Sequence, residues 1–274
     1  MSRAARAAGA RRSARPARRP GWVPQQHGAW AMLLVPFVAG VLRSHGAWIQ
    51  LPLLGFWLLA YLAFQAAGLW VKSRFKRRYR APVLAYGAGT VAVGVPIAVW
   101  RPDLLWWAPA FAACLAVSLS YSWRRHERAL ANDVVTIVAA GVFGLVTYQA
   151  GYSPGGTILA GWRGMVVIVA VLVAYFVGTA LYVKTIIRER DSRGYRIASV
   201  AYHAAVTLVL ALVVALPTLP PGVPHRPMTA FAACFAALTV RAWALGGRAV
   251  RPLYVGLGEL GVCAVLLAIV AVWR

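Results

Sequence analysis

The chain has 274 residues, of which 61% are hydrophobic and only 13% are charged, and its mean hydropathy is +0.67. An ordinary soluble domain carries about 25% charged residues, so this composition excludes the soluble class and indicates a polytopic membrane protein. The formal net charge of +23 comes in part from an arginine-rich N-terminus.

The N-terminal segment, MSRAARAAGARRSARPARRP, contains no acidic residue and is not followed by an apolar region with a small-residue cleavage site, so it does not have the pattern of a signal peptide. We predict that residues 1–22 form a disordered, basic cytoplasmic tail that contacts anionic lipid head groups. No aromatic or folded context accompanies these arginines, and we expect no nucleic-acid partner. Residues 23–274 are predicted to form a single transmembrane helical domain.

Apolar runs of the length needed to cross a bilayer, about 20 residues, follow one another along the rest of the chain. None of them alternates with a period of two, which argues for helices rather than an outer-membrane barrel. The predicted fold is therefore all-α, a polytopic membrane bundle of about nine transmembrane helices. The predicted spans are 24–42, 48–71, 82–100, 103–123, 131–150, 163–183, 197–217, 228–246 and 252–273.

Nine crossings place the basic segments between spans on the same side as the N-terminal tail. The positive-inside rule then predicts a cytoplasmic N-terminus and an external C-terminus in the inner (plasma) membrane. The segments concerned are 72–80, 124–128, 184–196 and 248–251. The loops on the other side are rich in Gly and Pro and hold no catalytic set.

Polar side chains enter the first two spans from this cytoplasmic side. Gln26 and His27, in PQQHGAW, need hydrogen-bond partners once water is lost, and both ligand binding and interfacial anchoring fit them. Gln65 lies about 10 Å inside the boundary, at 1.5 Å per residue, and fits either a contact between helices or a binding site. Lys72 opens a basic run that suits phosphate or anionic lipid. Asn132 and Asp133 are predicted to cap the fifth span.

The later spans carry His203, Arg241 and Glu259 in their cytoplasmic halves. Arg241 and Glu259 would lie about 7 Å and about 10 Å from the inner boundary on adjacent spans, so we expect an ion pair. Burying either charge alone in lipid costs several kcal/mol, which makes a partner or a water-filled cavity necessary. Together these residues predict a polar cavity that opens to the cytoplasm.

The stretch YVKTIIRERDSRGYR, residues 182–196, has the densest paired charge in the chain. At helical spacing Lys184, Arg188 and Asp191 share a face. Two successive cations facing a cavity are costly unless an anion such as a diphosphate or a lipid phosphate binds there. The alternative is that these side chains extend to the head groups.

QQHGAW with the following LLVPF, and YVKTIIRER later, resemble the YwiC-like family of bacterial integral membrane proteins over most of the chain outside the tail. This resemblance implies relatives without implying a reaction. More distantly, nine helices with charged segments after the second and sixth resemble the UbiA-type prenyltransferases, whose Asp-rich motifs at those places bind magnesium and an isoprenyl diphosphate. The DxxxD pattern is absent from both segments here.

We expect no metal and no cofactor, since the three cysteines lie in apolar spans without metal-ligand spacing. The first functional hypothesis is a cytoplasm-facing site that binds a phosphate-bearing lipophilic molecule, such as an isoprenoid or another anionic lipid, with metal-independent transferase activity as an extension. The alternatives are a transporter of a small anion and a structural or regulatory membrane protein. The predicted ligand-binding residues are Gln26, His27, Gln65, Lys72, Lys184, Arg188, Asp191, His203, Arg241 and Glu259.

Overall fold

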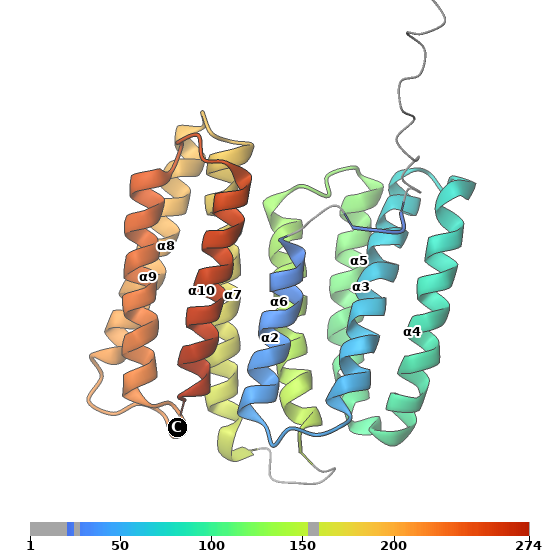
Figure 1. Cartoon of the computed structure of the whole chain (residues 1–274), viewed down its shortest axis with the longest axis horizontal. Helices are drawn as coiled ribbons and strands as arrows, with labels where there is room; N and C mark the ends of the chain where they lie inside the picture. The colour runs from blue at the N-terminus through green and yellow to red at the C-terminus, as the bar shows by residue number, and fades with distance from the viewer. Residues whose placement is uncertain (1–20, 25–27, 153–158, 274) are drawn as a thin grey trace, which may run out of the picture.

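The computed structural model describes residues 21–24, 28–152 and 159–273, and the regular structure in these ranges is helical. The helices lie side by side as an antiparallel bundle (Figure 1). In chain order they are α2 (Ala29–Arg43), α3 (Gln50–Lys72), the 3-10 helix η2 (Arg77–Tyr79), α4 (Arg80–Trp100), the 3-10 helix η3 (Pro102–Trp107), α5 (Ala108–Trp123), α6 (Leu130–Ala150), α7 (Leu159–Ile187), α8 (Arg193–Val214), α9 (His225–Leu245) and α10 (Pro252–Ala271).

Eight helical segments of the described chain are long and apolar enough to cross a membrane, which confirms the predicted multi-pass bundle. The first predicted span, 24–42, is the one that differs most. Its helix α2 begins at Ala29 and has 15 residues, fewer than the roughly 20 that a crossing needs. Residues 25–27, which belong to this predicted span, lie outside the described ranges.

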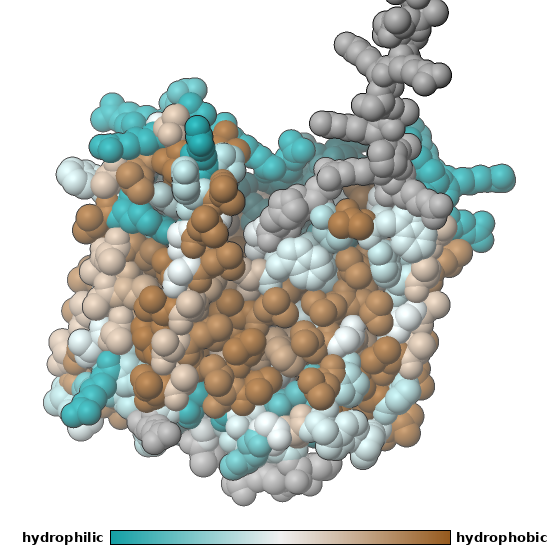
Figure 2. All heavy atoms as spheres, viewed as in Figure 1, coloured by the Kyte–Doolittle hydropathy of each residue, from teal (hydrophilic) through white to brown (hydrophobic). Residues whose placement is uncertain are grey.

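A hydrophobic band lies between the two ends of the bundle (Figure 2), and the two ends differ in how many basic residues they carry. The connections α3–α4, α5–α6, α7–α8 and α9–α10 lie together at the end drawn uppermost in Figure 1, and each contains Lys or Arg. We call this the basic end. The opposite end of the described chain carries only four arginines, namely Arg43, Arg101, Arg163 and Arg226.

The short helix α2 lies in the middle of the bundle, where it packs against α6, α7 and α10 (Figure 1). Its crossing with α6 depends on two glycines. A Cβ at Gly40 would lie 2.6 Å from the carbonyl oxygen of Gly144, and one at Gly144 would lie 2.8 Å from that of Pro36. Small residues of this kind allow helix backbones to touch inside a membrane.

A buried arginine organises the opposite end between η3 and α6. The Arg101 side chain donates to both carboxylate oxygens of Asp103 at 2.8 Å, and also to the carbonyls of Gln149 and Ala150. These carbonyls belong to the last turn of α6 and have no partner within the helix. Gln149 completes the network by donating to Asp103 and accepting from Trp107.

We predict opposite effects for the same substitution at two glycines. Gly144→Ala should lower the free energy of unfolding by about 1–3 kcal/mol, because the new methyl group overlaps the backbone of α2. Gly87→Ala on α4 meets open space and should be neutral or stabilising by up to about 1 kcal/mol. Thermal unfolding of the purified protein in detergent measures both. Equal effects would contradict the close α2–α6 contact.

Candidate functional site

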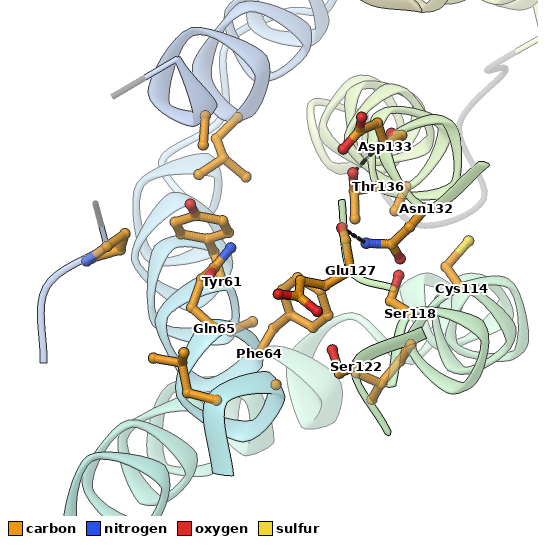
Figure 3. A pocket seen from close by; sticks show the side chains of 18 of the residues that line it. Tyr61, Phe64, Gln65, Cys114, Ser118, Ser122, Glu127, Asn132, Asp133 and Thr136 are labelled. Atoms are coloured by element: carbon orange, nitrogen blue, oxygen red, sulfur yellow. Dashed lines mark hydrogen bonds between the residues drawn. The ribbon is translucent and has the colours of Figure 1, made fainter. Parts of the chain in front are cut away.

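A cavity of about 670 Å³ lies between α2, α3, α5 and α6 near the basic end. Figure 3 shows its side chains converging from α3 on one side and from α5 and α6 on the other. The cavity contains both apolar and polar surfaces. Its principal apolar residues are Met32, Leu33, Trp57, Phe64, Phe111 and Leu115, and its principal uncharged polar residues are Tyr61, Gln65, Ser118, Ser122, Asn132 and Thr136.

Depth along the helices explains this division. Trp57 and Phe111 lie nearer the opposite end of their helices, and Trp57 stacks on the buried Phe143 with ring centroids 4.1 Å apart. The Trp57 indole also donates to the Leu33 carbonyl at 3.3 Å, which links α3 to α2. Polar residues follow towards the basic end, where α3 and α5 finish and α6 starts. The cavity is therefore apolar inside and polar at its rim.

Two lysine–carboxylate pairs hold the rim in place. Lys72 at the end of α3 pairs with Glu127 in the α5–α6 connection. Lys184 of α7 lies 2.9 Å from the Asp133 carboxylate of α6 and donates to the Arg128 carbonyl at 2.8 Å. Lys72, Glu127 and Asp133 line the cavity, whereas Lys184 lies behind Asp133 and supports it.

Two arginines add charge to the rim without being neutralised there. Arg128 and Arg188 both line the cavity, are exposed, and form no salt bridge with the described residues. With the two lysines paired to the two carboxylates, these arginines leave the rim positively charged.

Three cavity-lining polar atoms are buried without a hydrogen-bond partner among the described residues. They are the Tyr61 hydroxyl, Glu127 Oε2 and Asn132 Oδ1. An unsatisfied buried polar group costs about 1–3 kcal/mol, and native proteins retain few of them. Such atoms mark places where a bound molecule or water completes the hydrogen bonding.

The predicted cap of α6 is wrong in position. The N-cap residue is Ala129, three residues before Asn132, and no side chain caps this helix. Asn132 instead donates from its amide nitrogen to the Glu127 carbonyl at 2.9 Å, and Asp133 pairs with Lys184. Because the helix starts before Asn132, neither side chain is used as a cap. Both line the cavity, and Asp133 also pairs with Lys184.

Only three of the predicted ligand-binding residues line this cavity, namely Gln65, Lys72 and Arg188. Lys184 contributes indirectly through Asp133. Asp191 is exposed in the turn between α7 and α8 and does not line the cavity. Gln26 and His27 lie outside the described residues.

The remaining predicted residues lie in a separate polar cluster among α7, α8, α9 and α10. Arg241 and Glu259 pair at 2.7 Å, as expected from their depth. Tyr175 and Thr179 donate to the other oxygen of Glu259 at 2.6 and 2.8 Å.

The flanks of this second cluster are aromatic and polar. The Arg241 guanidinium lies over the Tyr182 ring, 4.1 Å from its centroid. The buried His203 is 2.7 Å from the Ser199 carbonyl through Nδ1, and its Nε2 packs close to Gly178. His203, Arg241 and Glu259 therefore fix the packing of the C-terminal helices and are not part of the cavity.

Sequence reasoning did not identify several residues of the cavity as part of a site. Glu127, Arg128 and Asp133 were visible as charges in the α5–α6 segment, but Asp133 was assigned to capping. Two of the chain's six acidic residues lie in this short segment, and this density was the available signal. Tyr61 and Ser118 carried no such signal, because a hydroxyl in an apolar span is common at helix contacts.

Comparison with known proteins identifies the family of the chain. A protein described as "Uncharacterized protein YwiC" from Bacillus subtilis is 32% identical over 190 residues, which cover 69% of this chain and 77% of the relative. The chain belongs to the YwiC-like family. The sequence model of the YwiC-like protein family matches residues 23–148, a range that contains every cavity-lining residue except Gly21 and Arg188.

A second family relative comes from Haemophilus influenzae and is described as "Uncharacterized protein". It is 28% identical over 191 residues, which cover 69% of this chain and 77% of the relative. No solved structure matches the chain. The resemblance to UbiA-type prenyltransferases thus stays a prediction.

We predict strong coupling between Arg241 and Glu259. Glu259→Leu alone leaves a buried guanidinium without its counter-ion and should lower the free energy of unfolding by about 3–5 kcal/mol. Arg241→Met, which leaves the carboxylate unpaired, should lower it by a similar amount. The double variant should cost less than the sum, because it leaves neither charge unpaired. Thermal unfolding of the four proteins gives the cycle, and additive losses would contradict a paired role.

The Lys72–Glu127 pair makes a pH-dependent prediction. Burial favours the neutral Glu127 carboxyl, but the Lys72 hydrogen bond, a backbone hydrogen bond and the charges of Lys72 and Arg128 together outweigh burial and hold the Glu127 pKa below its ordinary value of 4.5. A lowered pKa stabilises the fold above that value and ceases to do so as pH falls through the folded-state pKa.

At pH 7, Glu127→Gln should therefore lower stability, by about 1 kcal/mol or less because the pair is partly exposed. This deficit should vanish well below pH 4.5 in thermal unfolding measured across pH. Glu189→Gln, whose carboxylate forms no salt bridge in the described chain, is the control and should show no such trend. A deficit at Glu127 that persists in acid would contradict the role of Lys72.

Proposed function

We propose that this protein binds an amphipathic molecule with a phosphate-bearing head in the cavity between α2, α3, α5 and α6. The observation that carries the proposal is the combination of an apolar interior with a rim that holds two arginines outside any described salt bridge. The hydrocarbon part occupies the interior, and the phosphate lies at the rim.

The size and lining of the cavity support a small-molecule ligand. Its volume of about 670 Å³ falls within the range of about 300–1,000 Å³ that is typical of ligand sites. Such sites are mostly apolar with a few placed polar groups, which matches Trp57, Phe64 and Phe111 beside Gln65 and Asn132.

The rim supports an anionic head. Arg128 and Arg188 come from separate connections, one between α5 and α6 and one after α7, and both reach the same cavity. Guanidinium groups bind phosphate through charge-assisted, bidentate hydrogen bonds. Lys72 adds a third cation, although it is shared with Glu127.

We propose that the basic end faces the cytoplasm and that the ligand enters from that side of the plasma membrane, in keeping with the positive-inside rule. Transport through the bundle is less well supported. Below the cavity lies a cluster of buried side chains that fills the space towards the opposite end, including Phe37, Leu53, Phe143 and Val146. This favours a site that is closed on the far side.

The proposal goes no further than binding. In a prenyltransferase-like reaction, grouped carboxylates would hold the metal ions of a diphosphate, but Glu127 and Asp133 are each paired with a lysine. In the part of the chain that the structure describes, no three His, Cys, Asp or Glu side chains gather as they would around a metal ion. We therefore derive no transfer step.

Removing the two rim arginines tests the proposal. Full-length protein in maltoside micelles is titrated with decyl phosphate or, for comparison, decanol, and the affinity is taken from ligand-induced thermal stabilisation. Decyl phosphate should bind the wild type more tightly than decanol. The variant Arg128→Gln/Arg188→Gln should lose roughly tenfold or more in affinity for decyl phosphate, because each charge-assisted bond contributes about 1.5–3 kcal/mol.

A matched control removes the same charge from the same two segments. Arg124→Gln/Arg193→Gln alters exposed arginines that do not line the cavity, and it should leave the affinity within about twofold. Equal losses in the two double variants would mean that phosphate is attracted only by the overall charge of the basic end, and the proposal would then be wrong.

A further inference from the structure

The cavity wall formed by α5, α6 and their connection carries two buried oxygen acceptors that have no partner among the described residues, Glu127 Oε2 and Asn132 Oδ1. Asn132 is only 8% exposed, and its amide nitrogen is already used in the bond to the Glu127 carbonyl. The other carboxylate oxygen of Glu127 is paired with Lys72. Each side chain therefore has one satisfied polar atom and one that is left over.

Two serines extend the same wall. Ser118 and Ser122 on α5 are 2% and 7% exposed, and both line the cavity. Figure 3 shows them on the same side of the cavity as Asn132, whereas the Glu127 carboxylate projects from the α5–α6 connection towards Phe64. Serine hydroxyls can accept as well as donate hydrogen bonds. We call Ser118, Ser122, Glu127 and Asn132 the acceptor wall.

A phosphate diester cannot by itself satisfy the two unpaired acceptors of this wall. Its oxygens carry no hydrogen, and they would face the Glu127 carboxylate and the Asn132 carbonyl oxygen without a hydrogen between them. Arg128 and Arg188 on the same cavity provide the donors that a phosphate needs. The site thus offers donors at its rim and acceptors on one wall. This arrangement suits a head group that carries both acceptor oxygens and a hydrogen-bond donor.

We infer that the bound head group carries an N–H or O–H donor next to its phosphate, as in a phosphate ester of an amino alcohol or a polyol. The donor binds Glu127 Oε2 and Asn132 Oδ1 while the phosphate binds the two arginines. A primary ammonium matches best, because its bond to a carboxylate is charge-assisted. This inference rests on the proposed function and names the ligand class for the same cavity.

The test uses two single-chain probes that differ only in the groups on their nitrogen, three hydrogens in one and three methyl groups in the other. Decylphosphoethanolamine and decylphosphocholine share the chain, the phosphate and the positive nitrogen, but only the former has N–H groups. Wild-type protein should bind the ethanolamine probe roughly tenfold or more tightly, the equivalent of one charge-assisted hydrogen bond. Decylphosphoglycerol, with hydroxyl donors only, should fall between them and so separates the two donor types.

Substitutions in the wall should remove this preference. Asn132→Leu should bring the ratio of the two affinities close to one, and a cooperative thermal unfolding transition near that of the wild type shows that the variant is folded. Ser118→Ala is a milder change and should reduce the ratio by a few-fold. Ser120→Ala, which alters an exposed serine of α5 that does not line the cavity, should leave the ratio unchanged.

The outcomes separate this inference from the proposed function. Equal affinity for the ethanolamine and choline probes in the wild type would overturn the inference and mean that water satisfies the wall, whereas decyl phosphate binding would still support the proposed function. A preference that survives both Asn132→Leu and Ser118→Ala would likewise overturn it. If the wild type prefers the ethanolamine probe but Arg128→Gln/Arg188→Gln binds that probe as tightly as the wild type does, the proposed phosphate site would be overturned instead.

Discussion

The close contact between α2 and α6 is the constraint on which the bundle depends. At Gly40 and Gly144 the two backbones approach until each glycine position has no room for a methyl group. This contact holds the short helix α2 in the centre, where it also packs against α7 and α10 and so joins the two halves of the bundle. The cavity lies beside the part of α2 nearer the basic end, lined there by Ala29, Met32 and Leu33.

Scarce carboxylates explain much of the remaining organisation. The chain has six acidic residues, and four of them pair with a cation in the described structure. Asp103 organises the opposite end, Glu259 joins α10 to α7 and α9, and Glu127 and Asp133 hold the cavity rim. At the cavity rim both carboxylates are paired with lysines, so the charges of Arg128 and Arg188 are not balanced by a salt bridge among the described residues.

Helix α7 links the cavity and the C-terminal polar cluster. Tyr175, Thr179 and Tyr182 face the Arg241–Glu259 pair, whereas Lys184 extends to Asp133 on α6 and Arg188 reaches the cavity rim. The two polar regions therefore belong to different faces and depths of the same helix. One region joins the C-terminal helices, and the other borders the cavity.

The sequence by itself determined the helical bundle, the gathering of charge at one end and the Arg241–Glu259 pair. Hydropathy fixes which segments lie in lipid, and the rise of 1.5 Å per residue fixes the depth of each side chain within its span. Because all of them lie at similar depth, His203, Arg241 and Glu259 were predicted to share a cavity with Gln65 and Lys72. In the structure they form a separate cluster among the C-terminal helices. Only the tertiary structure decided which helices are neighbours and which way each side chain points around its axis. It thereby placed Asn132 and Glu127 in the cavity and Lys184 behind it, because these positions depend on packing between helices rather than on order along the chain.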